Sequence, residues 1–202
     1  MRSKLALLVL PALVLLLPAA ALAIATGDAI PMKETKLRNI DGRELAIADV
    51  AGAKGTLVVF TCNHCPFANA WEDRIAALGK DYSEQGIGVI AINSNDPAAV
   101  PADGYEEMQA RAKQKGFGFA YAVDATSGVA RAFGATKTPE VFLFDAGGKL
   151  AYHGAVDDNS ENAEAVKAHY LKDALEAVLA GKPVALAETK ALGCGIKFRK
   201  EG

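Results

Sequence analysis

Continuous apolar runs alternate with amphipathic stripes along the centre of the chain, and this pattern predicts a sheet covered by helices. Residues 56–61 and 88–92 are short, uninterrupted apolar runs, which are typical of strands buried on both faces. Between them, apolar residues recur at spacings of four, four and three, which predicts a helix over 67–78 that ends at Gly79. The order of strand, helix and strand is that of a parallel β-α unit.

The flanking regions extend this pattern into a complete domain. Upstream, Asp41-Gly42 between two short alternating runs predicts a hairpin over 36–47. Asp103 and Glu106 resemble a capping box that opens a helix. The remaining predicted elements are a helix over 105–115, a strand over 120–123, a helix over 125–133, hairpin strands over 140–144 and 150–153, and a helix over 164–180. Parallel units followed by a hairpin and a closing helix indicate a mixed-sheet α/β domain without an internal boundary.

Residues 1–23 have the pattern of a secretory signal peptide, and residues 24–202 form the expected domain. Arg2 and Lys4 precede a long apolar run that ends in small residues. An uncleaved membrane anchor is the alternative, because an apolar run of this length could span a bilayer. In both cases the domain is expected to be exported, to the periplasm or another extracytoplasmic compartment.

Composition narrows the classes of function. The chain has 202 residues, of which 51% are hydrophobic, and it carries 22 Lys plus Arg against 24 Asp plus Glu, for a net charge of -2 at pH 7. This balance describes a folded domain and gives no electrostatic basis for nucleic-acid binding. Contact with a membrane is expected only through the signal segment. A small-molecule or protein partner is therefore expected.

The candidate chemistry lies at Cys62-Asn63-His64-Cys65, between a predicted buried strand and the helix that follows. Amides at a helix N-terminus lower the pKa of a nearby thiol, so Cys62 is the expected nucleophile. Cys65 lies one turn further on, where it can form a disulfide with Cys62 and resolve a mixed disulfide. His64 adds positive charge near the thiolate, so we hypothesise a disulfide that is more oxidising than that of a thioredoxin.

The cysteine pattern leaves other interpretations open. A metal-binding module built from Cys62, Cys65 and a histidine is one, although a zinc site usually needs a second cysteine pair. A structural disulfide is another. Cys194, the third of 3 cysteines, lies between two glycines, which suits a mobile arm that resolves a mixed disulfide at Cys62. A packed, unreactive thiol at Cys194 is supported equally. The redox interpretation requires no cofactor.

Short motifs along most of the chain carry a resemblance to a known family. They are Thr61–Phe67, Asn93–Asp96, Thr138–Glu140, Tyr152–Gly154, Asp157–Asn159 and Gly193–Lys197. Together with the element order, they make residues 30–180 similar to the thioredoxin superfamily, in its redoxin branch, the alkyl hydroperoxide reductase/thiol-specific antioxidant-like group. The resemblance implies a thioredoxin-like fold, with an N-terminal hairpin and with a β-α unit inserted between Cys65 and Pro139.

The same resemblance implies an activity and a binding groove. It implies that Pro139 is cis and faces the cysteines, and that the backbone of Thr138 pairs with an extended substrate strand. The implied activity is that of a thiol-disulfide oxidoreductase acting on protein thiols or disulfides together with a redox partner protein. A peroxiredoxin-like thiol peroxidase, in which Cys62 reduces peroxide through a sulfenic acid, is the alternative. Val59 and Gly55 stand where typical peroxiredoxins have Thr and Pro, which weakens that alternative.

Overall fold

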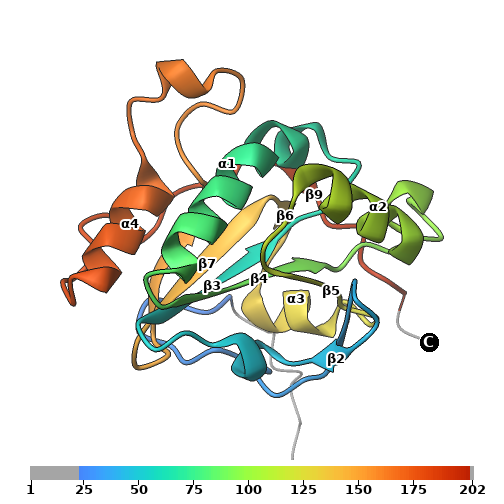
Figure 1. The fold of residues 1–202 in the computed structure, drawn as a ribbon, viewed down its shortest axis with the longest axis horizontal. Coiled ribbons are helices and arrows are strands. Elements are labelled where there is room, and N and C mark those ends of the chain that lie inside the picture. Colours follow the sequence, from blue (N-terminus) through green and yellow to red (C-terminus); the bar gives the residue numbers. More distant parts are fainter. Residues whose placement is uncertain (1–22, 201–202) are drawn as a thin grey trace, which may run out of the picture.

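The computed structural model describes residues 23–200, which form a seven-stranded mixed sheet with helices on both faces (Figure 1). The order across the sheet is β2-β1-β5-β4-β3-β7-β8. The strands are β1 (Leu37–Asn39), β2 (Glu44–Leu45), β3 (Gly55–Phe60), β4 (Ile87–Asn93), β5 (Ala120–Val123), β7 (Glu140–Asp145) and β8 (Leu150–Gly154). Strands β3, β4 and β5 are parallel, whereas β1 and β7 run antiparallel to their neighbours. The predicted mixed α/β sheet, with its N-terminal hairpin and inserted β-α unit, is confirmed.

Two layers of helix cover the sheet. The helices are α1 (Pro66–Ser83), α2 (Tyr105–Lys115), α3 (Gly128–Phe133) and α4 (Tyr170–Leu179), with short 3-10 turns η1 (Ile47–Val50), η2 (Pro101–Asp103) and η3 (Ala163–Ala165). Alternate side chains of β3 point to opposite faces. Leu57 and Val59 pack with α1 and α4, whereas Val58 and Phe60 pack with Phe133 of α3. This double burial is the physical reason for the uninterrupted apolar run.

Three helix boundaries differ from the sequence prediction, and one of them is the start of α3, which lies at Gly128 and not at residue 125. Helix α1 does not end at Gly79 but continues to Ser83 and buries Tyr82. A Cβ at Gly79 would lie 2.6 Å from the ring of Phe119, so the glycine permits close packing inside the helix and does not terminate it. Helix α4 begins only at Tyr170, because the preceding residues are mostly exposed and offer no apolar stripe for the sheet.

Both ends of the described chain are hydrogen-bonded to strands of the domain. Near the first end, Gly27 N donates to Leu150 O of β8 at 2.8 Å. Near the other end, β9 (Cys194–Gly195) pairs with β6 (Lys137–Thr138) in a separate two-stranded sheet. The predicted signal segment falls almost entirely on residues 1–22, outside the described residues. Within residues 23–200, every helix is too short or too polar to cross a bilayer.

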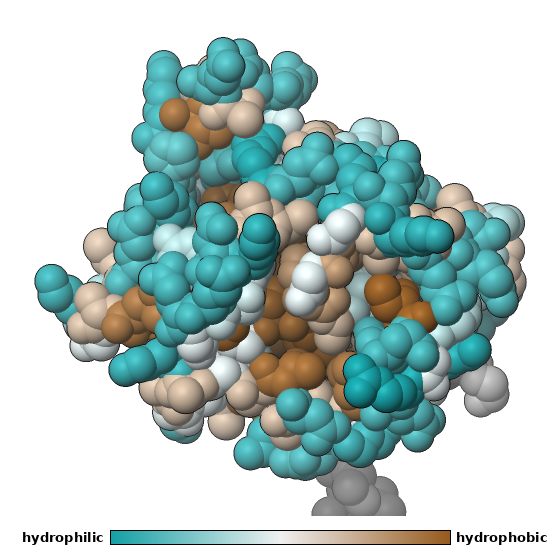
Figure 2. Space-filling model, viewed as in Figure 1, coloured by the Kyte–Doolittle hydropathy of each residue, from teal (hydrophilic) through white to brown (hydrophobic). Residues whose placement is uncertain are grey.

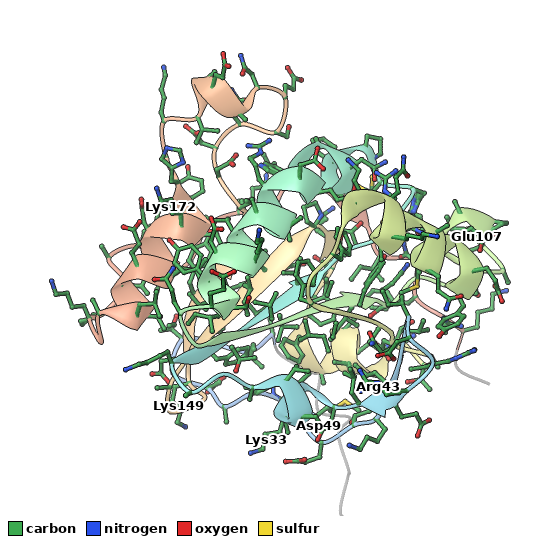
Figure 3. All side chains as sticks on the ribbon, in the orientation of Figure 1. Lys33, Arg43, Asp49, Glu107, Lys149 and Lys172 are labelled. Carbon is green, nitrogen blue, oxygen red and sulfur yellow. The ribbon has the colours of Figure 1, made fainter. Side chains whose placement is uncertain are left out.

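The surface mixes both signs of charge around an apolar centre. Figure 2 shows apolar side chains gathered in the middle of one face, with hydrophilic residues around them. The charged side chains labelled in Figure 3 point outward from the periphery of the same view; these are Lys33, Arg43, Asp49, Glu107, Lys149 and Lys172. Both acidic and basic groups lie around this face.

Candidate functional site

The cysteine pair lies in the short loop between β3 and α1, and both sulfurs are enclosed by the fold. Helix α1 begins at Pro66, with Cys65 as its N-cap, so Cys65 is the cysteine closest to the free amides of the helix. Cys62 lies one turn before the helix, and its side chain retains 3% exposure, whereas Cys65 has 0%. The three cysteines are free thiols. Of the pair, Cys62 is the sulfur nearer to solvent.

One residue, Thr138, contacts both sulfurs. Its hydroxyl lies 3.1 Å from Cys62 Sγ, and its carbonyl oxygen accepts a hydrogen bond from Cys65 Sγ at 2.9 Å. The Thr138–Pro139 peptide bond is cis. This is the arrangement that the family resemblance implied for Pro139 and the cysteine pair. The Thr138 hydroxyl can donate a hydrogen bond to a Cys62 thiolate, and its carbonyl can hold a protonated Cys65.

The two thiols titrate as one coupled pair. The pKa of Cys65 is lowered to about 4, chiefly because Cys62 donates a hydrogen bond to its thiolate. The same hydrogen bond and burial raise the pKa of Cys62, and the negative charge of Asp103 raises it further, so the expectation that the helix N-terminus lowers the pKa of this thiol is wrong. The pair therefore shares a single proton at neutral pH. Transfer of that proton from Cys62 to Cys65 produces a Cys62 thiolate beside the Thr138 hydroxyl.

His64 is held between Cys62 and a buried carboxylate. Its Nδ1 lies 3.5 Å from Cys62 Sγ and 2.7 Å from Asp103 Oδ2. The Asp103 side chain is 0% exposed. The sequence assigned Asp103 to a capping box, but α2 is capped by Gly104 without a side-chain bond, so that assignment is wrong. Asp103 turns inward instead, because the residues around His64 supply hydrogen-bond donors for its carboxylate.

A polar network fixes the loop that carries His64. Asn63 N donates to Asp103 Oδ1 at 2.7 Å, and Asn95 Nδ2 donates to Asp103 Oδ2 at 2.7 Å. The hydroxyl of Tyr121 donates to Asn63 Oδ1 at 3.2 Å, and burial raises the pKa of this tyrosine. The sequence marked Asn95 only as part of a motif at the carboxyl end of a strand, and it missed Asp103 and Tyr121 as site residues. The carboxyl ends of parallel strands gather functional groups, and this is the signal that could have found Asp103.

Cys62, His64 and Asp103 also form a group of metal-ligating type. One potential ligand atom from each lies within 4.8 Å of the others. However, Nδ1 of His64 faces both Asp103 and Cys62, and its 2.7 Å contact with the carboxylate has the length of a direct hydrogen bond. The other carboxylate oxygen is held by Asn63 N. These groups already serve as hydrogen-bond partners for one another. Their geometry therefore fits a hydrogen-bonded network better than a cation-binding site.

The C-terminal segment runs directly through the expected binding groove. Cys194 pairs with Thr138 in antiparallel register, and its N–H donates to Cys65 Sγ at 3.3 Å. Its side chain packs against Cys62, Cys65 and Ala68. The sequence favoured neither a mobile arm nor a packed thiol, and the structure places Cys194 beside Cys62 and Cys65. In this structure β9 pairs with the backbone of Thr138, which the family resemblance assigns to an extended substrate strand.

Glu140 and His153, which belong to two of the matched motifs, have structural contacts. Glu140 Oε2 accepts from the amides of Thr136 and Lys137 at 2.8 Å, and its Oε1 lies 2.6 Å from His153 Nε2. Both side chains therefore shape the segment that leads into Thr138.

The acidic loop after β8 binds α1. Asp157 accepts a hydrogen bond from Trp71 Nε1 at 2.8 Å and forms an ion pair with Arg74. Asp157 is buried, so this ion pair fixes the loop against the helix that follows the cysteine pair.

Comparison with known proteins shows the family of the chain. The model of the AhpC/TSA family matches residues 26–153, more than half of the chain. Thiol-disulfide oxidoreductase ResA of Halalkalibacterium halodurans is 25% identical over 114 residues, which cover 56% of this chain and 60% of that relative. The match therefore spans less than two thirds of the relative's length.

Two solved structures resemble nearly the whole chain. A hypothetical protein from Sinorhizobium meliloti 1021 is 36% identical with a TM-score of 0.82, covering 89% of this chain and 97% of that one. An uncharacterized conserved protein from Geobacillus kaustophilus is 34% identical with a TM-score of 0.82, covering 88% and 94%. The family match includes the cysteine pair and Thr138. By fold and by family match, the chain is a thioredoxin-like member of the AhpC/TSA family, with a thiol-disulfide oxidoreductase among its relatives.

Proposed function

We propose that this protein is an exported thiol-disulfide oxidoreductase whose redox centre is Cys62 and Cys65. The observation that carries the proposal is the contact of Thr138, beside cis Pro139, with both sulfurs. A structural disulfide needs no such contact with its reduced sulfurs. Protein thiols or disulfides and a redox partner protein are the proposed reactants, and no cofactor is required.

In the proposed reaction, the Cys62 thiolate attacks a substrate disulfide. A Cys62–substrate bond forms, the substrate S–S bond breaks, and the departing thiolate takes a proton. Cys65 then attacks Cys62 Sγ, so that a Cys62–Cys65 disulfide forms and the second substrate sulfur leaves as a thiol. His64, at 3.5 Å from Cys62 Sγ, would stabilise the reduced state and make the disulfide more oxidising.

Export is proposed from the signal pattern of residues 1–23. The segment that follows it already belongs to the domain, since Ile24 packs against the core. An oxidising compartment would also favour the use of paired cysteines as a redox centre.

The thiol-peroxidase alternative lacks a side-chain hydroxyl at position 59 of β3, three residues before Cys62. Val59 and Gly55 are buried in this strand and offer no side-chain hydroxyl that could position a peroxide.

Trapping the mixed disulfide tests the proposal. With Cys65→Ser and Cys194→Ser combined, a disulfide-bonded peptide should remain attached to Cys62, because neither candidate resolving thiol is left. Intact-mass and peptide mapping would identify the adduct, which should not form when Cys62→Ser is combined with Cys194→Ser. If dilute hydrogen peroxide oxidised Cys62 faster than Cys62 reacts with the peptide disulfide, the result would contradict the proposal and favour a peroxidase.

A further inference from the structure

The C-terminal strand β9 lies where an extended substrate would pair beside the cysteines. Cys194 is opposite Thr138 and Gly195 is opposite Lys137 in the antiparallel ladder. The ladder extends by one bond, since Ile196 N donates to Thr136 O at 2.9 Å. Recognition by added strand pairing uses the same backbone groups. In this structure, that position is occupied by the protein's own C-terminal segment, residues 189–197, which we call the tail.

Glycine at position 193 is what allows this close approach. A Cβ there would lie 2.2 Å from Thr138 O and 3.2 Å from Pro139 N, and both of these atoms belong to the backbone. At Gly195 the nearest atom to a Cβ is Thr136 O at 4.0 Å, which is an ordinary contact. Two glycines on either side of Cys194 thus differ sharply in the space that surrounds them.

Hydrogen bonds hold the tail on both sides of this contact. Upstream, Thr189 Oγ1 lies 2.6 Å from the Tyr152 hydroxyl and accepts from Ala155 N at 3.0 Å. Downstream, Lys197 N donates to Asn95 Oδ1 at 2.7 Å. The side chain of Asn95 also donates to the carboxylate of Asp103. One residue therefore joins the tail to the network that positions His64.

Cys194 faces the redox pair from this strand. Its N–H donates to Cys65 Sγ, and its side chain contacts the cluster of Cys62, Cys65 and Ala68. Burial raises the pKa of its thiol to about 11, so in the reduced protein Cys194 is predominantly a thiol. A cysteine that merely filled space under the tail would have no need to stand in register with Thr138.

We propose that residues 193–196 form a built-in substrate strand and that Cys194 is a third redox thiol, which exchanges with the disulfide of the pair at Cys65. The inference rests on the proposed redox function of Cys62 and Cys65. In the exchange, the Cys194 thiol loses its proton and its sulfur attacks Cys65 Sγ. A Cys65–Cys194 bond forms, the Cys62–Cys65 bond breaks, and Cys62 leaves as a thiolate that accepts the proton. The step is neutral in electrons and needs no further reactant.

This exchange gives the oxidised protein two disulfide isomers. In one, Cys194 is a thiol and Cys62 is covalently blocked. In the other, the tail is tied to Cys65 and Cys62 is free beside His64. A polypeptide that pairs with Thr138 must first displace the tail, so the segment also selects against extended protein substrates while it is bound.

Disulfide mapping tests the proposal without reference to any physiological substrate. Full-length Cys62→Ser protein, oxidised gently with glutathione disulfide, should form a Cys65–Cys194 bond, and mapping of the oxidised wild type should show both isomers. Gly193→Ala should slow formation of the Cys65–Cys194 bond by about tenfold or more, because it separates the tail from Thr138. The matched Gly195→Ala variant should stay within about twofold of the parent.

The outcomes separate this proposal from the function on which it rests. A reversible Cys62–Cys65 couple without any Cys65–Cys194 bond, in the wild type and in Cys62→Ser alike, would overturn the third-thiol proposal alone. Equal slowing by Gly193→Ala and Gly195→Ala would also contradict it, because strand docking would then not control the exchange. Loss of the Cys62–Cys65 couple itself would overturn the proposed function. The disulfide map of the oxidised wild-type protein tests the third-thiol proposal even if one of the variants fails to fold.

Discussion

Replacing Asp103 with alanine should lower the free energy of unfolding by about 3–5 kcal/mol. This is the range expected when one partner of a buried pair of charged groups is removed. The carboxylate is fully buried and accepts from Asn63 N, Asn95 Nδ2 and His64 Nδ1. Alanine leaves these donors without their acceptor, and each unsatisfied buried group costs about 1–3 kcal/mol. Urea denaturation of the reduced protein, followed by tryptophan fluorescence, measures the effect.

Asp73→Ala is the matched control for this prediction. The Asp73 carboxylate pairs with Lys115 at 2.8 Å, but its side chain is 78% exposed. Exposed ion pairs contribute only about 0–1 kcal/mol, so Asp73→Ala should leave the midpoint almost unchanged. If Asp103→Ala destabilised the protein no more than Asp73→Ala does, the buried network would not hold the loop that carries His64.

The second large effect is expected in the pH dependence of the reduced thiols. Thiolate absorbance at 240 nm should persist as the pH is lowered from neutral and should disappear only near pH 4. The reason is the hydrogen bond from Cys62, which lowers the pKa of Cys65 to about 4. Cys62→Ala removes this donor and should move the midpoint upward by about 2 pH units or more. Cys194→Ala removes a weaker contact and should move it less.

The same ionisation affects the stability of the reduced protein. The pKa of Cys65 in the folded state lies below that of an unfolded thiol, which is about 8.5. Its contribution to stability is therefore complete above the unfolded pKa and is lost as the pH falls through the folded value, near 4. A reduced protein whose thiolate signal titrates only at pH 8–9 would show that the two sulfurs do not share a proton.

Local sequence patterns were sufficient to predict most of the helices and strands that carry the site. The apolar run of β3 and the stripe of α1 predict their elements, because burial on a sheet and on a helix imposes different periods. The position of the cysteine pair between these elements follows directly. Gly79 led to a wrong prediction of the C-terminal end of α1, because a glycine that makes room for Phe119 has the same local sequence signal as a C-cap glycine.

The site beyond the CxxC depends on contacts that local patterns do not encode. Asp103 precedes a helix and reads as a cap, yet three-dimensional proximity to His64 and Asn95 decides its role. The pairing of Cys194 with Thr138 joins segments far apart in the sequence, and a two-residue strand has no periodic signature. The flanking glycines indicated a special segment, but only the fold shows what it approaches.

A glutathione redox titration of the wild-type domain, with thiol trapping and peptide mapping, tests the central claim most directly. The account predicts a reversible two-electron Cys62–Cys65 couple with a potential less negative than that of thioredoxin, which is about -270 mV. The reason for expecting a less negative potential is the 3.5 Å contact between His64 Nδ1 and Cys62 Sγ. Thiols that never form a reversible couple at any glutathione ratio, or that are protected by a bound metal throughout, would contradict it.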